Sequence, residues 1–175
     1  NTVSNQVVCN GSAVTAVNFS TTATGGTVTY AWTNSNSTIG LSASGSGNIA
    51  SFTATNNGTA PVTATITVTP TFTNAGVSCQ GTAQTFTITV NPTATVNAIS
   101  IQTVCNGAAV SAVNFATTAT GGTVTYNWTN NNSSIGLAAS GTGNIASFNA
   151  INNNNAPVTA TITVTPTFIN GGVSC

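Results

Sequence analysis

The stretch from residue 62 to residue 69 reads Val62-Thr63-Ala64-Thr65-Ile66-Thr67-Val68-Thr69, with apolar and polar residues in strict alternation. Successive side chains of a β-strand point to opposite faces of a sheet, so this pattern predicts a strand with one buried apolar face and one threonine face. Residues 86–90 repeat the pattern as Phe86-Thr87-Ile88-Thr89-Val90. No segment shows a helical period of useful length, and we therefore expect an all-β fold.

The chain contains an internal repeat with a period of 96 residues. The segment Val8-Cys9-Asn10-Gly11 recurs as Val104-Cys105-Asn106-Gly107, and 59 of 75 positions are identical when residues 101–175 are aligned with residues 5–79. This period is too long for one solenoid unit and suits a sandwich domain of about 100 residues. We therefore predict tandem β-sandwich domains of about seven strands each.

The repeat also predicts the domain boundaries. We place the first repeat at residues 1–92, a short linker at 93–96 and the second repeat at 97–175. The second repeat has no counterpart of residues 80–91, which contain the predicted last strand of the first repeat. We expect an open sheet edge there, filled either by a continuation of the chain or by a strand from a neighbour.

Clusters of glycine, asparagine and serine separate the predicted strands, as turn-forming residues do. Several short strands at this spacing indicate a sandwich. Pro70 lies late in the sixth strand, which predicts a sheet edge or a bulge at that point. The predicted strands of the first repeat are 3–8, 13–23, 27–33, 38–43, 48–55, 61–72 and 83–91, and those of the second repeat follow by adding 96.

Large aromatic residues are expected in the core of each repeat. Alternation along residues 27–33 puts Tyr30 and Trp32 on the same apolar face as Val28, a setting that aromatic and β-branched residues favour. Phe52 stands at an inward position between small residues. The predicted core aromatics of the two repeats are Tyr30, Trp32, Phe52, Tyr126, Trp128 and Phe148.

The four cysteines predict one disulfide in each repeat, Cys9–Cys79 and Cys105–Cys175. In a seven-strand sandwich the first strand starts at the end where the sixth strand finishes, so Cys9 and Cys79 are expected to meet. The rival pairing of Cys79 with Cys105 has to span the last strand of the first repeat, about 30 Å. A zinc site is disfavoured because close pairs of cysteines are missing from the sequence. Disulfides indicate an oxidising compartment outside the cytosol.

The chain contains no Asp, Glu, Lys, Arg or His. Acid–base catalysis needs a group that exchanges protons near neutral pH, and hydroxyl nucleophiles need a base, so we expect no enzyme and no cofactor. Calcium sites use carboxylates and nucleic-acid binding uses Lys and Arg, so neither partner is expected. No apolar run approaches the roughly 18 residues of a membrane span, so we expect no direct membrane insertion.

The outward threonines form a possible contact face of two neighbouring strands. A neutral solvated face built from good strand formers is the simpler interpretation. Lateral contact between fibres, binding of a neutral glycan and, as a distant third, ice binding are the functional alternatives. The residues of this face are Thr63, Thr65, Thr67, Thr69, Thr85, Thr87 and Thr89.

Several segments together resemble a known kind of repeat: Cys9-Asn10-Gly11, Tyr30-Ala31-Trp32-Thr33, residues 62–70 and residues 136–146. They resemble the PKD-like, immunoglobulin-like repeats of very large surface proteins of Bacteroidota, including gliding adhesins and other cell-surface fibres. The resemblance covers nearly the whole chain and implies an immunoglobulin-like sandwich in an exported, surface-attached or released fibre. That family usually carries some charge, and its absence here is a departure that argues against a charge-based ligand.

Two functional hypotheses follow. The first is a structural segment of an extracellular or cell-surface filament, with domains stacked end to end, stapled by disulfides and in contact with other copies or adjacent repeats. The absence of charge favours it, because chains near zero net charge tend to associate. The alternative is an adhesin module that binds a neutral glycan or surface, which requires a concave pocket with exposed aromatic residues.

Overall fold

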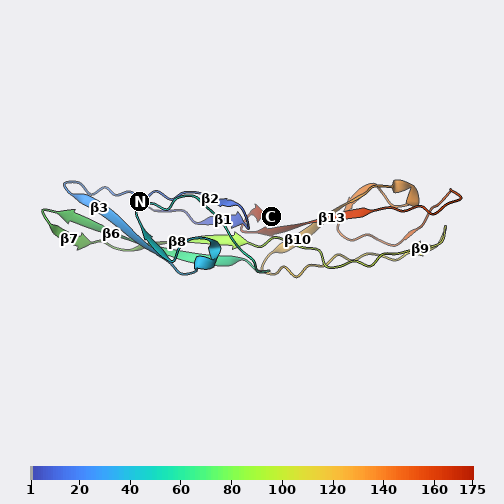
Figure 1. Ribbon diagram of the computed structural model, residues 1–175, viewed down its shortest axis with the longest axis horizontal. Helices are drawn as coiled ribbons and strands as arrows, with labels where there is room; N and C mark the ends of the chain where they lie inside the picture. The colour runs from blue at the N-terminus through green and yellow to red at the C-terminus, as the bar shows by residue number, and fades with distance from the viewer. Residues whose placement is uncertain (1) are drawn as a thin grey trace. The chain divides into compact units, whose positions relative to one another are not determined.

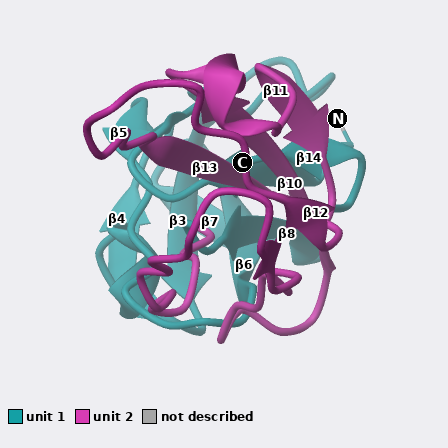
Figure 2. Cartoon of the chain, turned by 90° about the vertical axis from the view of Figure 1, so that its right-hand side faces the viewer, with its two compact units in different colours: residues 1–93, 170–175 teal, residues 94–169 magenta. Residues whose placement is uncertain are grey.

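The structure is a computed structural model that describes residues 2–175 (Figure 1). The chain is all-β, with several sheets arranged as in a β-sandwich. It divides into two compact units, which Figure 2 shows in different colours. Unit 1 comprises Asn1–Thr93 together with Asn170–Cys175, and unit 2 comprises Ala94–Ile169. The prediction that residues 97–175 form one domain is therefore wrong at its end, because the last six residues belong to unit 1.

The main sheet of unit 1 has the strand order β1-β8-β6-β3-β4, and β7 pairs with β6 beyond the end of β8. A small second sheet pairs β2 with β5. Strand β1 runs parallel to β8, whereas β8, β3 and β7 are each antiparallel to β6. The elements of residues 1–93 are β1 (Gln6–Cys9), β2 (Ala13–Val14), β3 (Thr27–Asn34), the 3-10 helix η1 (Ser37–Ile39), β4 (Ser44–Ser46), β5 (Phe52–Thr53), β6 (Val62–Asn74), β7 (Val77–Gln80) and β8 (Gln84–Asn91).

The core of unit 1 lies on the apolar face of β6 and β8. Ala64 and Ile66 of β6 and Ile88 and Val90 of β8 are fully buried, as the period-two pattern requires. They pack with Val14, Val17, Ile39, Leu41 and Ile49 from the opposite side of the core. The threonines between them point to the other face of the sheet.

The region predicted as a strand at 38–43 is not a strand. Asn36 caps the helix η1, with its side chain accepting a hydrogen bond from the Thr38 backbone nitrogen. Gly40 ends the helix with a φ of 96°, a left-handed conformation that glycine adopts without a steric penalty. The asparagine cap and the glycine four residues later therefore determine the conformation here, despite the strand preference of the β-branched residues Thr38 and Ile39.

Pro70 lies inside β6, which is a central strand, so the predicted edge or bulge takes the form of a local gap in the pairing on one side of the strand. Pairing of β6 with β8 ends at Val68, and pairing with β7 begins at Thr71. Pro70 falls in the gap between the two partners, where its missing N–H costs no ladder hydrogen bond. Its carbonyl accepts a hydrogen bond from the Gly81 nitrogen.

Unit 2 repeats the same plan with a smaller sheet, ordered β11-β10-β13-β14. A second small sheet pairs β12 with β9. The elements are β9 (Ala109–Val110), β10 (Thr123–Asn130), the 3-10 helix η2 (Ser133–Ile135), β11 (Ser140–Thr142), β12 (Phe148–Asn149) and β13 (Ile162–Asn170), followed by β14 (Val173–Ser174) in the last segment of unit 1.

Strand β13 lacks the neighbour that β6 has in β8. Within residues 2–175 no strand pairs with β13 on that side. Strand β13 begins at Ile162, whereas the first residue of β6, Val62, corresponds to Val158 in the second repeat, four residues earlier. Ile162 and Val164 of β13, and Ala160 just before it, are half-buried, whereas their counterparts in the first repeat are buried. The described part of unit 2 is therefore an open sandwich.

Candidate functional site

The disulfide of this chain joins Cys9 to Cys175. The predicted pairs Cys9–Cys79 and Cys105–Cys175 are both wrong. Among the described residues, Cys79 and Cys105 are exposed free cysteines. Cys9 belongs to the first sequence repeat and Cys175 to the second, so the bond connects one repeat to the end of the next while both cysteines lie in unit 1.

The register of the main sheet explains the error. Cys9 is the last residue of β1, where it lies beside Asn91 of β8 and near the start of β6. Cys79 in β7 pairs with Phe72, near the finish of β6. Val62 and Phe72 are ten residues apart along β6, which separates the two cysteines by about 33 Å. Strand β1 does run in the direction opposite to that of β6, as the prediction assumed, but Cys9 is the last residue of β1 and therefore lies at the opposite end of β6 from Cys79.

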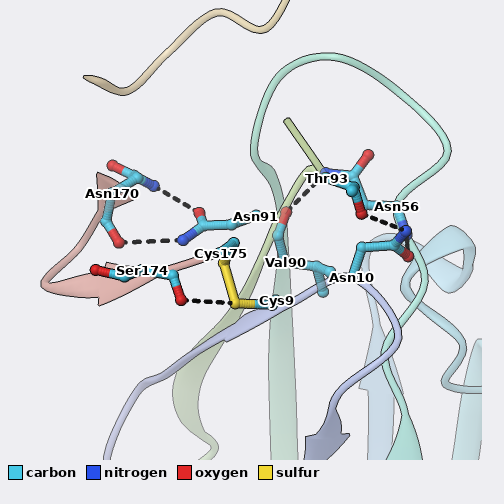
Figure 3. The surroundings of a disulfide bond; sticks show 9 residues. All are labelled: Cys9, Asn10, Asn56, Val90, Asn91, Thr93, Asn170, Ser174 and Cys175. Atoms are coloured by element: carbon cyan, nitrogen blue, oxygen red, sulfur yellow. Dashed lines mark hydrogen bonds between the residues drawn. A yellow bond between two sulfur atoms is a disulfide. The ribbon is translucent and has the colours of Figure 1, made fainter. Parts of the chain in front are cut away.

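Two asparagines support the disulfide (Figure 3). The Asn91 amide Nδ2 donates to the Asn170 carbonyl at 3.1 Å, and the Asn170 Nδ2 donates to Asn91 Oδ1 at 2.9 Å. Asn91 is fully buried, so the pair also satisfies an amide that would be costly to leave without partners. Sequence analysis missed this pair, and the only signal was an asparagine at the end of an otherwise alternating strand.

The turn before Cys175 approaches the first strand closely. A Cβ atom added to Gly171 would lie 3.1 Å from a methyl carbon of Val7, and Gly171 has a φ of 59°. Glycine thus serves both the left-handed turn and the close approach. The Cys9 sulfur lies 3.4 Å from the Ser174 carbonyl oxygen, a contact without a shared proton because both sulfurs are in the disulfide.

An asparagine network fixes the backbone around Cys9, as Figure 3 also shows. Asn56 donates from Nδ2 to the Val90 carbonyl at 2.7 Å, and its backbone nitrogen donates to Asn10 Oδ1 at 2.8 Å. Asn10 donates in turn to the Thr93 hydroxyl at 3.3 Å. These bonds tie the end of β1 to the end of β8, so the surface that receives the Cys175 segment is held in place from within unit 1.

We call the surface formed by Gln6–Cys9 of β1 and Ile88–Asn91 of β8 the docking surface. The segment Asn170–Cys175, with its turn and the short strand β14, is called the cysteine hairpin end. In unit 1 this hairpin end lies against the docking surface through Cys175, Asn170 and Gly171.

The threonine face is built as a regular array across two adjacent strands. Thr63 lies opposite Thr89, and their hydroxyls are 2.9 Å apart. Thr65 and Thr67 lie opposite Thr87 and Thr85 in the same way. The exposed or half-buried members are Thr63, Thr65, Thr67, Thr69, Thr85, Thr87 and Thr89.

The predicted core aromatics occupy two different settings. Trp32 and Trp128 are 8% and 7% exposed. Neither indole nitrogen has a hydrogen-bond partner within the described residues, so the rings are held by packing. Tyr30, Phe52, Tyr126 and Phe148 are half-buried and pack against the two cores.

A hollow of about 220 Å³ opens beside Phe19, Tyr30 and Phe86 of unit 1. The rings of Phe19 and Tyr30 lie 5.4 Å apart between centroids. In unit 2 the counterpart of Phe19, Phe115, is buried, and Val96 packs against the cluster that contains it.

No cluster of three potential metal ligands occurs in residues 2–175, and no helix of this described range could span a membrane. Comparison with protein-family models gave no match. A search of curated protein sequences gave none either.

Proposed function

We propose that this chain is a structural repeat segment of an extracellular or cell-surface filament in which consecutive repeats are joined by disulfides. The observation that carries the proposal is the bond between Cys9 of the first repeat and Cys175 of the second. A disulfide inside one repeat stabilises that repeat alone. A disulfide from one repeat to the next gives a tandem array a second covalent connection besides its backbone.

The environment of the bond supports a permanent connection. The buried Asn91 makes two hydrogen bonds to Asn170, and a fixed asparagine network surrounds Cys9. Disulfides persist in oxidising compartments, which agrees with a location outside the cell. The immunoglobulin-like and PKD-like resemblance of the repeats agrees with the same proposal.

The absence of charged side chains is a second support. Surfaces without charge do not repel one another at low ionic strength, and proteins near zero net charge tend to associate. The threonine face offers hydroxyls in a regular spacing with no ionic groups. Such a surface suits close lateral contact between identical filaments.

The test is electron microscopy of the native material, labelled with an antibody raised against this chain. We expect the label to decorate filaments outside the cell at regular intervals. Reductant together with denaturant should disperse the filaments, because it removes the disulfides and the apolar burial together. Label confined to the cell interior, or to dispersed material alone, would refute the proposal.

The adhesin alternative is favoured by one observation, the hollow beside Phe19 and Tyr30. Aromatic rings with nearby hydroxyls suit the apolar faces of neutral sugars. The chain should then show saturable NMR shifts of the Tyr30 ring on titration with neutral oligosaccharides, and Tyr30→Ala should abolish binding. Unchanged ring signals across a panel of oligosaccharides would remove this alternative.

A further inference from the structure

We infer that Cys105 and Cys79 are complementary halves of the same link, so that Cys105 of one copy of this chain forms a disulfide with Cys79 of a second copy, head to tail. The inference rests on the proposed function and names the partner of each free cysteine. The repeat offset carries it, because Cys105 stands 96 residues after Cys9 and Cys79 stands 96 residues before Cys175. Cys105 therefore occupies the receiving position of Cys9, and Cys79 occupies the donating position of Cys175.

Residues 74–79, which end at Cys79, already have the turn of the cysteine hairpin end. Residues 74–79 read Asn-Ala-Gly-Val-Ser-Cys, and the docked hairpin end reads Asn-Gly-Gly-Val-Ser-Cys. Ala75 has a φ of 48°, close to the 59° of Gly171. A left-handed conformation is unfavourable for alanine, yet the same turn is kept in the copy that has no partner.

The side chains of residues 74–79 are more exposed to solvent than the matching side chains of the docked cysteine hairpin end. Val77 is 65% exposed, whereas its counterpart Val173 is half-buried in unit 1. Cys79 is exposed and Cys175 is half-buried. A large aliphatic side chain beside a free thiol is the surface expected of a hairpin end without its docking surface.

The residues around Cys105 keep the local hydrogen bonds that surround Cys9. The Gln6 side chain makes two hydrogen bonds to the backbone of Thr15, at 2.9 and 3.0 Å, and Gln102 makes the same two bonds to Ser111 at the same distances. The carbonyl of Cys105 accepts from Ala108 at 3.1 Å, as that of Cys9 accepts from Ser12 at 3.0 Å.

The asparagine beside the receiving half is retained as well. Asn106 Oδ1 accepts from the backbone nitrogen of Asn152 at 2.9 Å, the counterpart of the bond between Asn10 and Asn56. Val104 and Cys105 are exposed, whereas Val8 and Cys9 are half-buried. The two cysteines that remain free are thus placed at matching, uncovered surfaces.

One part of the receiving surface is not supplied by residues 2–175. The strand β8 and its Asn91 flank Cys9, and their counterparts would follow Cys175. A chain that carries a second copy of residues 80–93 after Cys175 would supply both. We therefore expect this extended chain to form the bond more completely than the chain of 175 residues.

Bond formation needs an oxidant, for which a small-molecule disulfide such as oxidised glutathione serves. The Cys79 thiolate attacks one sulfur of the small disulfide and releases one small thiol, leaving a mixed disulfide. The Cys105 thiolate of the other copy then attacks the Cys79 sulfur and releases the second small thiol. Two protein thiols are oxidised to one disulfide, and one small disulfide is reduced to two thiols.

The test uses two variants of the full chain, Cys79→Ser and Cys105→Ser, each of which keeps the Cys9–Cys175 bond and one free thiol. Each is oxidised in glutathione buffer, alone and mixed, with and without the added copy of residues 80–93. Chymotrypsin cleaves between all four cysteine positions, at aromatic residues, so mass spectrometry of the non-reduced digest identifies every pairing.

We expect the mixture to give at least about tenfold more covalent dimer than either variant alone, equivalent to about 1.4 kcal/mol of surface preference. The linked peptides should be those of Cys79 and Cys105, and the extended chains should give the larger yield. A mixed dimer no more than about twice as abundant as each homodimer in both arms, which is the ratio that random pairing of equal amounts gives, would overturn the inference. So would a digest of the unmutated chain that shows Cys9 joined to Cys79.

These outcomes separate the inference from the proposed function. Filaments in the native material without a Cys79–Cys105 preference would overturn the inference and leave the filament proposal standing. A strong preference for the mixed dimer with no extracellular filament would establish the link and refute the filament.

Discussion

Replacing Asn91 with alanine should weaken the Cys9–Cys175 disulfide without touching a cysteine. The side chain of Asn91 makes two hydrogen bonds to Asn170, at 2.9 and 3.1 Å, from a fully buried position. Each bond contributes about 0.5–1.5 kcal/mol net, so together they favour the docked hairpin end by about 2 kcal/mol. The equilibrium constant for closing the disulfide should fall about 30-fold.

The assay is a thiol–disulfide equilibrium in a Cys79→Ser, Cys105→Ser background. The chain is held in buffers of varied ratio of reduced to oxidised glutathione, quenched by alkylation and analysed by mass spectrometry. The measured quantity is the squared concentration of reduced glutathione divided by the concentration of oxidised glutathione at which half of the Cys9–Cys175 bond is reduced, because closing the bond releases two molecules of reduced glutathione. Asn91→Ala should shift this midpoint about 30-fold toward oxidising conditions.

A cycle of variants isolates the pair. Asn170→Ala removes only the bond that its own side chain donates to Asn91 Oδ1, because Asn91 Nδ2 donates to the backbone carbonyl of residue 170. Its shift should therefore be smaller, about fivefold, and the double variant should shift no further than Asn91→Ala. Ser174→Ala is the matched control in the same segment, since its side chain is exposed and only its carbonyl faces Cys9. A shift of less than about threefold for Asn91→Ala, or additive shifts in the double variant, would refute the reasoning.

Three further predictions concern packing and charge. A Cβ atom on Gly45 would overlap the Trp32 ring, so Gly45→Ala should lower the free energy of unfolding by about 1–3 kcal/mol in denaturant titrations followed by tryptophan fluorescence. Ser46→Ala should have little effect. Phe86 is 3% exposed, so Phe86→Ala should cost about 3–5 kcal/mol in the same titration, and a loss below about 1 kcal/mol would show that β8 is not part of the core. Because the chain has no Asp, Glu, Lys, Arg or His, its unfolding midpoint should be nearly constant from about pH 4 to pH 7 and hardly fall in about 1 M sodium chloride; a clear loss with mild acid would contradict this.

The alternating strands were the most predictable part of the fold. The pattern of residues 62–69 and 86–90 assigns inward and outward positions, and Ile66, Ile88 and Val90 are fully buried. Local periodicity is enough here because one face of each strand packs on the core. The segment 38–43 could not be assigned in this way, because the cap at Asn36 and the turn at Gly40 determine its conformation.

The cysteine pairing depends on information that is not local. To predict it, one must know at which end of β1 Cys9 lies and which unit residues 170–175 join. Both follow from the parallel pairing of β1 with β8 and from the position of residues 170–175 in unit 1. A single sequence records the spacing of 96 residues but not whether cysteines pair within a repeat or with the next repeat.

The link between Cys9 and Cys175 also has a mechanical consequence. The two cysteines are separated by 166 positions along the chain, a length that could extend to roughly 560 Å if unfolded. Tension applied from outside this loop passes through the sulfur–sulfur bond and leaves the enclosed backbone slack. A polymer with such connections would stretch little while oxidised and would release this hidden length once reduced, so its extensibility would be set by the redox state of its surroundings.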